Sequence, residues 1–184
     1  MRHSFITQKQ QSALLVIDIQ AGLEKVISEF NAVVANTITL LNAADTLQVP
    51  VLFTEQNPTK LGATASLLTE KRQTPLLCEK MHFSACLAND FLPQVAQLQR
   101  PQLVIVGMET HVCVLQTCLD LLAEGYQLFI VADAVASRNT AHKAIALSQL
   151  QQAGAVITCA ESVVFQWLEQ AGNDEFRSLL KTIK

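Results

Sequence analysis

The stretch Leu103-Val104-Ile105-Val106-Gly107-Met108-Glu109-Thr110-His111-Val112-Cys113-Val114 decides the fold that we expect for this chain. Its first four residues form an apolar run that is too short for a helix and too continuous for a half-exposed strand, which is typical of a parallel strand buried on both faces. From Val112 onward apolar residues recur at helical spacing, and Gly125 is suited to end that helix. The stretch therefore predicts a buried strand, a tight turn and a helix that begins close to Cys113.

Cys113 lies in the first turn of this predicted helix. Backbone N–H groups without helical partners and the positive end of the helix dipole favour a thiolate there, so Cys113 is a candidate nucleophile. The alternative is a buried core cysteine, which is the usual role of a free cysteine. The residues that the fold brings to Cys113 decide between these two interpretations.

Further apolar runs alternate with helical spacing along the chain. Short runs typical of buried strands lie at residues 13–17, 51–53, 75–78, 126–131 and 155–158. Helical spacing covers residues 23–48, 91–98 and 139–152 and a segment through Trp167, which a polar-faced tail follows at 174–184. This alternation predicts an α/β fold: a three-layer, doubly wound, Rossmann-like and mostly parallel six-stranded sheet with helices on both faces. We expect one domain over residues 1–184.

The composition limits the classes of function. Hydrophobic residues make up 50% of the 184 residues and charged residues 16%, which is typical of a core-rich globular protein. The net charge is −3, and no block of lysines or arginines provides an electrostatic footprint for nucleic acid or an anionic membrane. No apolar run is long enough to span a bilayer. We therefore expect a small-molecule partner, no nucleic acid and no membrane.

The cysteines and the N-terminus bear on the compartment. Five cysteines form no Cys-x-x-Cys pair, and their odd number argues against a disulfide framework, so we expect them to be reduced. The N-terminal residues lack a signal-type apolar block, which favours the cytoplasm. Part of the large apolar surface is expected to be covered by another copy of the chain, in a homo-oligomer that is a dimer or a tetramer.

Three predicted strand ends carry reactive side chains. Asp18 follows the first strand, Lys80 the third and Cys113 the fourth, and the carboxyl ends of parallel strands converge at one edge of a sheet. A carboxylate there can accept the thiol proton, and an ammonium can favour the thiolate and developing negative charge. Taken singly, Asp18 also fits a cap of the following turn, and Lys80 a solvated partner of Glu79. The three together favour a catalytic site.

Three segments resemble the signature segments of the isochorismatase-like cysteine hydrolases, the superfamily that includes the nicotinamidases. They are Asp18-Ile19-Gln20, Lys80 followed by Phe83-Ser84-Ala85, and the stretch from Gly107 to Val114. The resemblance implies that Asp18 is the general base, Lys80 the family's lysine and Cys113 the nucleophile. It also implies a non-prolyl cis peptide bond between Met108 and Glu109, in a turn whose N–H groups receive an oxyanion.

The chain departs from parts of the superfamily at two places. Nicotinamidases resemble one another in an Asp-x-His metal motif after the second strand, where this chain has Thr54-Glu55-Gln56-Asn57-Pro58. The resemblance therefore implies neither a bound metal nor nicotinamide as the substrate. Members that hydrolyse isochorismate lack the cysteine, so Cys113 argues against cleavage of a vinyl ether. Because no Gly-x-Gly-x-x-Gly or Gly-Lys-Ser/Thr motif is present, we expect no nucleotide cofactor.

The substrate pocket is expected around the loop that the sequence predicts over residues 54–74, because loops of this length are usually functional. Its candidate lining residues are Gln20, Phe53, Gln56, His82 and Phe83. Phe53 and Phe83, together with Leu61, fit an apolar wall around a small planar substrate and equally fit the core. Other polar residues receive structural interpretations: His111 at the rim, Cys118 in the core and Asp133 in a turn.

These expectations lead to a hydrolase that cleaves the carbon–nitrogen bond of a small amide. Cys113 forms a thioester, Asp18 acts as general base and Lys80 assists. A second hypothesis is a catalytically silent member that binds a small ligand or serves as a scaffold. A third is a redox-sensing thiol, for which the sequence offers no evident resolving cysteine.

Overall fold

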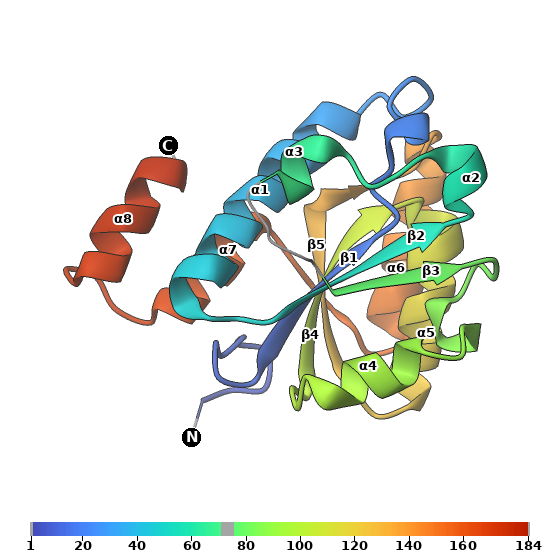
Figure 1. Cartoon of the computed structure of the whole chain (residues 1–184). Coiled ribbons are helices and arrows are strands. Elements are labelled where there is room, and N and C mark those ends of the chain that lie inside the picture. The colour runs from blue at the N-terminus through green and yellow to red at the C-terminus, as the bar shows by residue number, and fades with distance from the viewer. Residues whose placement is uncertain (1, 71–75, 184) are drawn as a thin grey trace.

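Six parallel strands form one sheet in the order β3-β2-β1-β4-β5-β6. The structure is a computed structural model, and it describes residues 2–70 and 76–183. The strands are β1 (Ser12–Ile17), β2 (Val51–Gln56), β3 (Leu76–Lys80), β4 (Gln102–Met108), β5 (Gln127–Ala136) and β6 (Val156–Thr158). The sheet fans out with its strands twisted about one another (Figure 1). The expected doubly wound α/β architecture is confirmed.

Helices cover both faces of this sheet (Figure 1). One face packs against α1 (Phe30–Leu47), α3 (Ser66–Thr69), α7 (Ala160–Leu168) and α8 (Asp174–Ile183). The other face packs against α4 (Phe91–Gln97), α5 (Leu115–Ala123) and α6 (Thr140–Gln152). The short helix α2 (Pro58–Leu61) follows β2. In the described residues no helix combines the length and the apolar character that a bilayer crossing needs.

The two hydrophobic cores explain why the central strands are apolar without interruption. In β1, Leu14 and Val16 point to the α1 side, whereas Leu15 and Ile17 point to the α5 side, because successive side chains of a strand alternate between faces. The neighbouring strand β4 alternates in the same way. A strand covered on both faces has no solvent side, so both sets of alternating side chains are apolar over residues 13–17 and 103–106.

The first helical segment is shorter than its spacing predicts. Helical spacing begins near Leu23, but α1 begins at Phe30, and residues 21–23 form only a 3-10 turn. Val26, an apolar residue within the predicted helical segment 23–48, is 55% exposed. The segment before α1 approaches the chain after β2 closely, since a Cβ on Gly22 would lie 2.6 Å from the Leu61 carbonyl oxygen. This approach replaces the expected first turns of the helix.

The predicted loop over residues 54–74 is also partly ordered into elements. Strand β2 continues to Gln56, and the short helices α2 and α3 follow it. Residues 71–75, which include the predicted start of a strand at Pro75, lie outside the described residues. Lys80 is the last residue of β3 rather than a residue beyond it. Ile145, an apolar residue within the predicted helical segment 139–152, is 59% exposed in α6 and does not lie on its inner face.

Candidate active site

Asp18 directly follows β1 at the carboxyl edge of the sheet. Its φ angle of 51° places it in the left-handed region, which aspartate tolerates better than most residues. The Asp18 N–H donates to the Thr54 carbonyl oxygen at 3.1 Å, so β2 fixes the turn. Ile17 pairs with Thr54 and Gln56 pairs with Lys80 in the parallel register. These pairings bring the ends of β1, β2 and β3 together.

Asp18 and Lys80 form a buried ion pair. The Lys80 Nζ donates to Asp18 Oδ2 at 2.6 Å, and both side chains are almost fully shielded from solvent. The Thr54 hydroxyl donates to the second carboxylate oxygen, Asp18 Oδ1, at 2.7 Å. A buried carboxylate needs such donors, because an unpaired one would be strongly destabilised. Both oxygens of Asp18 are therefore held in place.

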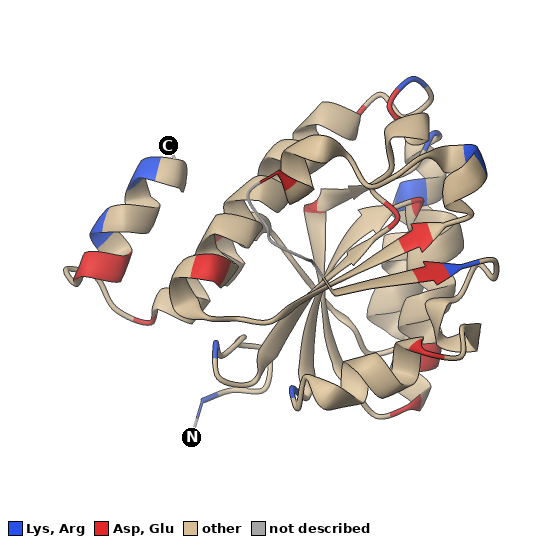
Figure 2. Ribbon diagram, in the orientation of Figure 1, with Lys and Arg blue, Asp and Glu red and all other residues tan. Residues whose placement is uncertain are grey.

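Lys80 is surrounded by hydrogen-bond acceptors. Besides Asp18, its Nζ donates to Gln56 Oε1 at 2.9 Å and contacts the carbonyl oxygens of Phe83 at 3.3 Å and His82 at 3.4 Å. The residues that follow β3 thus fold back around the lysine. In Figure 2 the strands are largely uncharged along their length, and acidic and basic residues appear at the ends of β2 and β3.

Gln20 and Gln56 connect this lysine to the neighbouring backbone. The Gln56 Nε2 donates to the Met81 carbonyl oxygen at 3.0 Å. Gln20 accepts from the Gln56 N–H at 2.8 Å and donates to the carbonyl oxygens of Gln56 and Gly62. Gln20, which we expected in the pocket, is fully buried and holds the chain segments together instead.

Cys113 lies beside this ion pair, in a π-helical turn (Thr110–Val114) that precedes α5. The residue is 6% exposed, and the charges of Asp18 and Lys80 act on its thiol. Burial, followed by the Asp18 charge, raises the pKa of the thiol to about 12, and Lys80 only partly offsets this. The expected thiolate is therefore wrong for the resting site, since desolvation outweighs the helix terminus.

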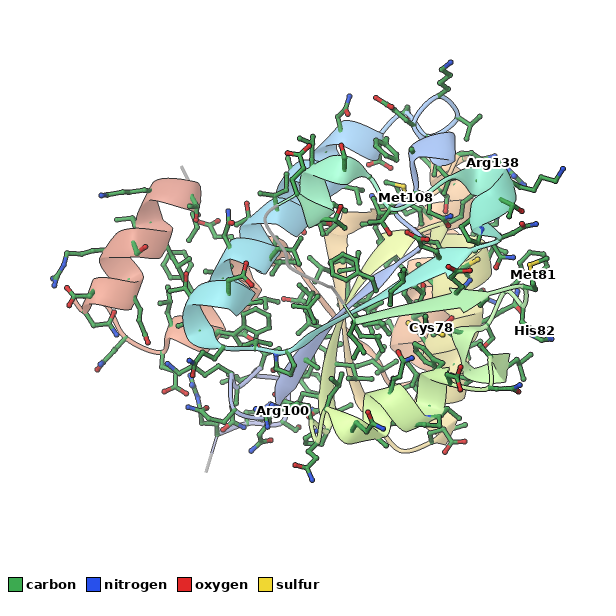
Figure 3. All side chains as sticks on the ribbon, in the orientation of Figure 1. Cys78, Met81, His82, Arg100, Met108 and Arg138 are labelled. Carbon is green, nitrogen blue, oxygen red and sulfur yellow. The ribbon has the colours of Figure 1, made fainter. Side chains whose placement is uncertain are left out.

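The turn between β4 and Cys113 contains a cis peptide bond between Met108 and Glu109. The Glu109 carboxylate forms an ion pair with Arg138 at 3.2 Å and lies 3.6 Å from the His111 ring. The His111 Nδ1 is 3.0 Å from the Ser137 hydroxyl oxygen. Met108 and Arg138 are labelled in Figure 3 near the ends of β4 and β5. Sequence reasoning gave Arg138 no part in this turn.

The expected pocket residues divide into three groups. Phe53 is 1% exposed and belongs to the core on the α1 side, whereas Cys113 belongs to the opposite core, so its assignment to the pocket is wrong. Gln56 contacts Lys80 directly. His82 and Phe83 are exposed at the rim, and Phe83 keeps 55% of its surface. Successive side chains of β2 alternate between the two faces of the sheet, so Phe53 faces the α1 side and its neighbour Leu52 faces the other side.

A cavity of about 390 Å³ opens beside the lysine at the outer edge of the sheet. Lys80, Met81, His82, Leu87 and Asp90 contribute to its lining. Figure 3 shows Met81 and His82 beyond the end of β3, far from Arg100 at the opposite end of the sheet. Of the three candidate catalytic residues only Lys80 lines this cavity, and neither Asp18 nor Cys113 does.

Other candidate residues have structural contacts. The Asp133 carboxylate accepts from the Ala160 N–H at 2.9 Å, so it caps α7 from within β5. Cys118 is fully buried in the core. Thr54 is the residue that sequence reasoning missed, although its place at the end of a strand beside Asp18 was a usable signal. Within the described residues, no group of three His, Cys, Asp or Glu side chains is placed to hold a metal ion.

The chain matches known proteins over nearly its whole length. The family model "Isochorismatase domain" matches residues 12–162. The secreted isochorismatase effector Isc1 of Phytophthora sojae (strain P6497) is 38% identical over an alignment of 182 residues, and the match covers 94% of this chain and 84% of that protein.

Two solved structures have the same fold. The MAR1 ribonuclease from Caenorhabditis elegans has a TM-score of 0.88 and 33% identity, and the match covers 97% of this chain and 92% of that one. YcaC from Pseudomonas aeruginosa, solved with hexane-2,5-diol and covalent acrylamide, has a TM-score of 0.90 and 26% identity, with 99% and 93% covered. Because the family model matches most of its length and its relatives are isochorismatase proteins, the chain belongs to the isochorismatase family of hydrolases.

Proposed function

We propose that the chain is a cysteine hydrolase that cleaves the carbon–nitrogen bond of a small amide. The observation that carries this proposal is the buried contact between Asp18 and Lys80 at 2.6 Å, beside the Cys113 thiol. A base, a cation and a nucleophile in one desolvated place are the parts that acyl transfer requires.

The first step transfers a proton. Because the pKa of the Cys113 thiol is raised to about 12, the sulfur needs a base at neutral pH. Asp18 accepts the thiol proton while the sulfur attacks the carbonyl carbon of the amide, and the carbonyl oxygen becomes an oxyanion. Lys80 supports the negative charge on the sulfur as the proton leaves. The N–H groups of the turn between Glu109 and Cys113 hold the oxyanion.

The second half of the reaction returns the enzyme to its starting state. Asp18 donates its proton to the leaving nitrogen, the carbon–nitrogen bond breaks, and a thioester with Cys113 remains. Water then attacks the thioester carbonyl carbon while Asp18 accepts a proton from it. The carbon–sulfur bond breaks, the carboxylic acid leaves, and Cys113 regains its proton from Asp18.

The test is a screen of small primary amides with the wild-type protein and the Cys113→Ala variant. We expect ammonia release by the wild type and an acyl adduct on Cys113 detected by mass spectrometry, and we expect the variant to show neither. Acrylamide, which is bound covalently in the related YcaC, is a suitable probe of the same thiol. Turnover that survives in Cys113→Ala contradicts the mechanism.

A second candidate function is a catalytically silent member that binds a small ligand or acts as a scaffold. The observation that favours it is the burial of Cys113, with a thiol that is protonated at neutral pH. Alkylation by iodoacetamide distinguishes the two candidates. Reaction of Cys113 at neutral pH supports catalysis, whereas a thiol that stays unmodified while the half-buried Cys159 reacts supports a silent protein.

We further propose that the protein works as a cytoplasmic homo-oligomer on a small molecule, with neither nucleic acid nor a membrane as its partner. The hydrophobic share of 50% and the exposed apolar side chains near β3 support self-association. These side chains are Leu76, Leu77, Met81, Phe83 and Leu87. Light scattering at micromolar protein concentration tests the assembly, and a monomer there contradicts it.

A further inference from the structure

We infer that the active site takes a substrate that is uncharged near its reacting carbonyl, and that it discriminates against substrates carrying a carboxylate or phosphate there. This inference rests on the proposed function, and it narrows the substrate class of the same site. A cation with free hydrogen-bond donors beside the thiol would favour a substrate that carries a carboxylate there. The question is whether the site provides one.

Lys80 is the cation that reaches the thiol, and its donors are already used. An ammonium has three N–H donors. Four oxygen acceptors surround Nζ: Asp18 Oδ2 at 2.6 Å, Gln56 Oε1 at 2.9 Å, and the carbonyl oxygens of Phe83 and His82 at 3.3 and 3.4 Å. A substrate carboxylate would have to displace one of them from a buried position. The Lys80 ammonium therefore binds groups of the protein itself and has no free donor for a substrate anion.

The remaining charges beside the thiol do not favour an anion either. In the part of the chain that the structure describes, the charged groups that act on the Cys113 sulfur are Asp18 and Lys80, one negative and one positive. On the other side of the turn, the Arg138 guanidinium lies 3.2 Å from the Glu109 carboxylate, which neutralises it. Each cation of the site thus has a carboxylate of its own.

The consequence concerns the oxyanion that forms during the reaction. A substrate that arrives with a negative charge adds a second anion next to Asp18 and the developing oxyanion, in a region from which water is excluded. An uncharged amide brings no such charge. The Gln56 side chain contributes to this, because its amide oxygen is the shortest uncharged contact of the Lys80 Nζ, at 2.9 Å.

Alkylation with a matched pair of reagents measures this preference without relying on turnover. Iodoacetamide is neutral and iodoacetate is anionic, and the two have nearly the same size. We measure both rate constants at Cys113 by mass spectrometry, in the folded protein and in the same protein unfolded in urea. The ratio of the iodoacetamide rate to the iodoacetate rate is expected to be about tenfold higher in the folded state. Equal ratios in the two states overturn the inference.

Two Gln56 variants connect the preference to the lysine. Gln56→Met removes the acceptor at 2.9 Å while keeping a similar shape. Besides Asp18, the Lys80 Nζ then keeps only the longer contacts to the carbonyl oxygens of Phe83 and His82, which an anion displaces more easily. The preference for the neutral reagent is therefore expected to shrink severalfold. Gln56→Glu adds a negative charge at the same place and is expected to increase the preference. A preference that stays the same in both variants overturns the assignment to Lys80.

A substrate pair separates this inference from the proposed function. Acetoacetamide and malonamate have similar shapes, and only the second carries a charge, on a carboxylate one methylene away from the amide carbonyl. We expect kcat/KM to be about tenfold higher for the neutral amide. Cys113-dependent hydrolysis of both compounds at equal rates contradicts the inference and leaves the proposed function intact. A Cys113 that neither turns over amides nor reacts with either alkylating reagent contradicts both.

Discussion

Because of its buried thiols, the free energy of unfolding of this protein should depend on pH in the alkaline range. Burial raises the pKa of Cys113 from 9.0 to about 12 and that of Cys86 to about 11. Above pH 9 an unfolded chain would release these protons while the folded chain keeps them. The folded state then binds more protons, so the free energy of unfolding falls as the pH rises. Each such thiol contributes about 1.4 kcal/mol per pH unit between its two pKa values.

We therefore expect a difference between the wild type and Cys113→Ala. From pH 9 to pH 11 the stability of the wild type should fall more steeply, by about 1.4 kcal/mol per pH unit, because the variant lacks one titrating thiol. Urea unfolding at a series of pH values measures both slopes. Parallel stability curves for the two proteins would contradict the raised pKa of Cys113.

Thr54 is a single residue with a testable role in holding Asp18. Its hydroxyl donates to Asp18 Oδ1 at 2.7 Å, and both residues are buried. Thr54→Val keeps the shape but leaves this oxygen without its donor, which should lower the free energy of unfolding by about 1–3 kcal/mol and reduce amide turnover. Thr54→Ser keeps the hydroxyl and is the matched control. If Thr54→Ser loses as much activity as Thr54→Val, the hydroxyl is not the cause.

Among the elements, the contact between β1 and β4 depends on Gly107. A Cβ at this position would lie 2.4 Å from the Ile17 carbonyl oxygen and 2.7 Å from its Cβ, just before Asp18. Gly107→Ala should therefore separate the two strands that carry Asp18 and the Cys113 turn. We expect a loss of roughly 3 kcal/mol in the free energy of unfolding and a loss of turnover.

The control for this variant is Gly154→Ala. Gly154 also has a positive φ angle, 107°, but nothing lies within 4 Å of an added Cβ. Gly154→Ala should lower the free energy of unfolding only by the cost of placing a non-glycine residue in this backbone conformation, about 1–2 kcal/mol, and it should retain activity. Urea unfolding and amide turnover of both variants decide the matter. A Gly107→Ala protein that equals the control in both measurements would show that the close approach is not important.

The strands of this fold were predictable from the sequence, whereas several element boundaries were not. Leu103 to Val106 and Ala13 to Ile17 are continuous aliphatic runs, and only burial on both faces explains such runs. The start of α1 depends instead on the approach of Gly22 to the chain after β2. That contact lies between distant segments, and local periodicity contains no information about it.

The same limit applies to the candidate site. Asp18, Lys80 and Cys113 could be placed at one edge, because strand ends of a parallel sheet converge there. The face on which Phe53 lies and the charge of Cys113 could not be predicted. The first depends on strand parity across a whole layer, and the second on desolvation that helix position alone does not reveal.

On the scale of the whole molecule, one sheet joins two hydrophobic cores. Trp167 is buried in the core on the α1 side and is the one tryptophan of the chain. Cys118 is buried in the core on the α5 side. Each strand of the centre contributes side chains to both cores, as Val104 and Ile105 do in β4. If either core unfolded, one face of the central strands would be exposed to solvent. The same strands would then no longer support the other core.

This arrangement predicts that both cores unfold together, as expected for one domain. Trp167 fluorescence follows the first core during urea unfolding. A short pulse of iodoacetamide, with Cys118 modification read by mass spectrometry, follows the second. The two transitions should have the same midpoint, because the shared strands cannot lose one layer and keep the other. A Cys118 midpoint well below that of Trp167 would instead mean that the α4–α5–α6 layer opens independently, and with it the turn that carries Cys113.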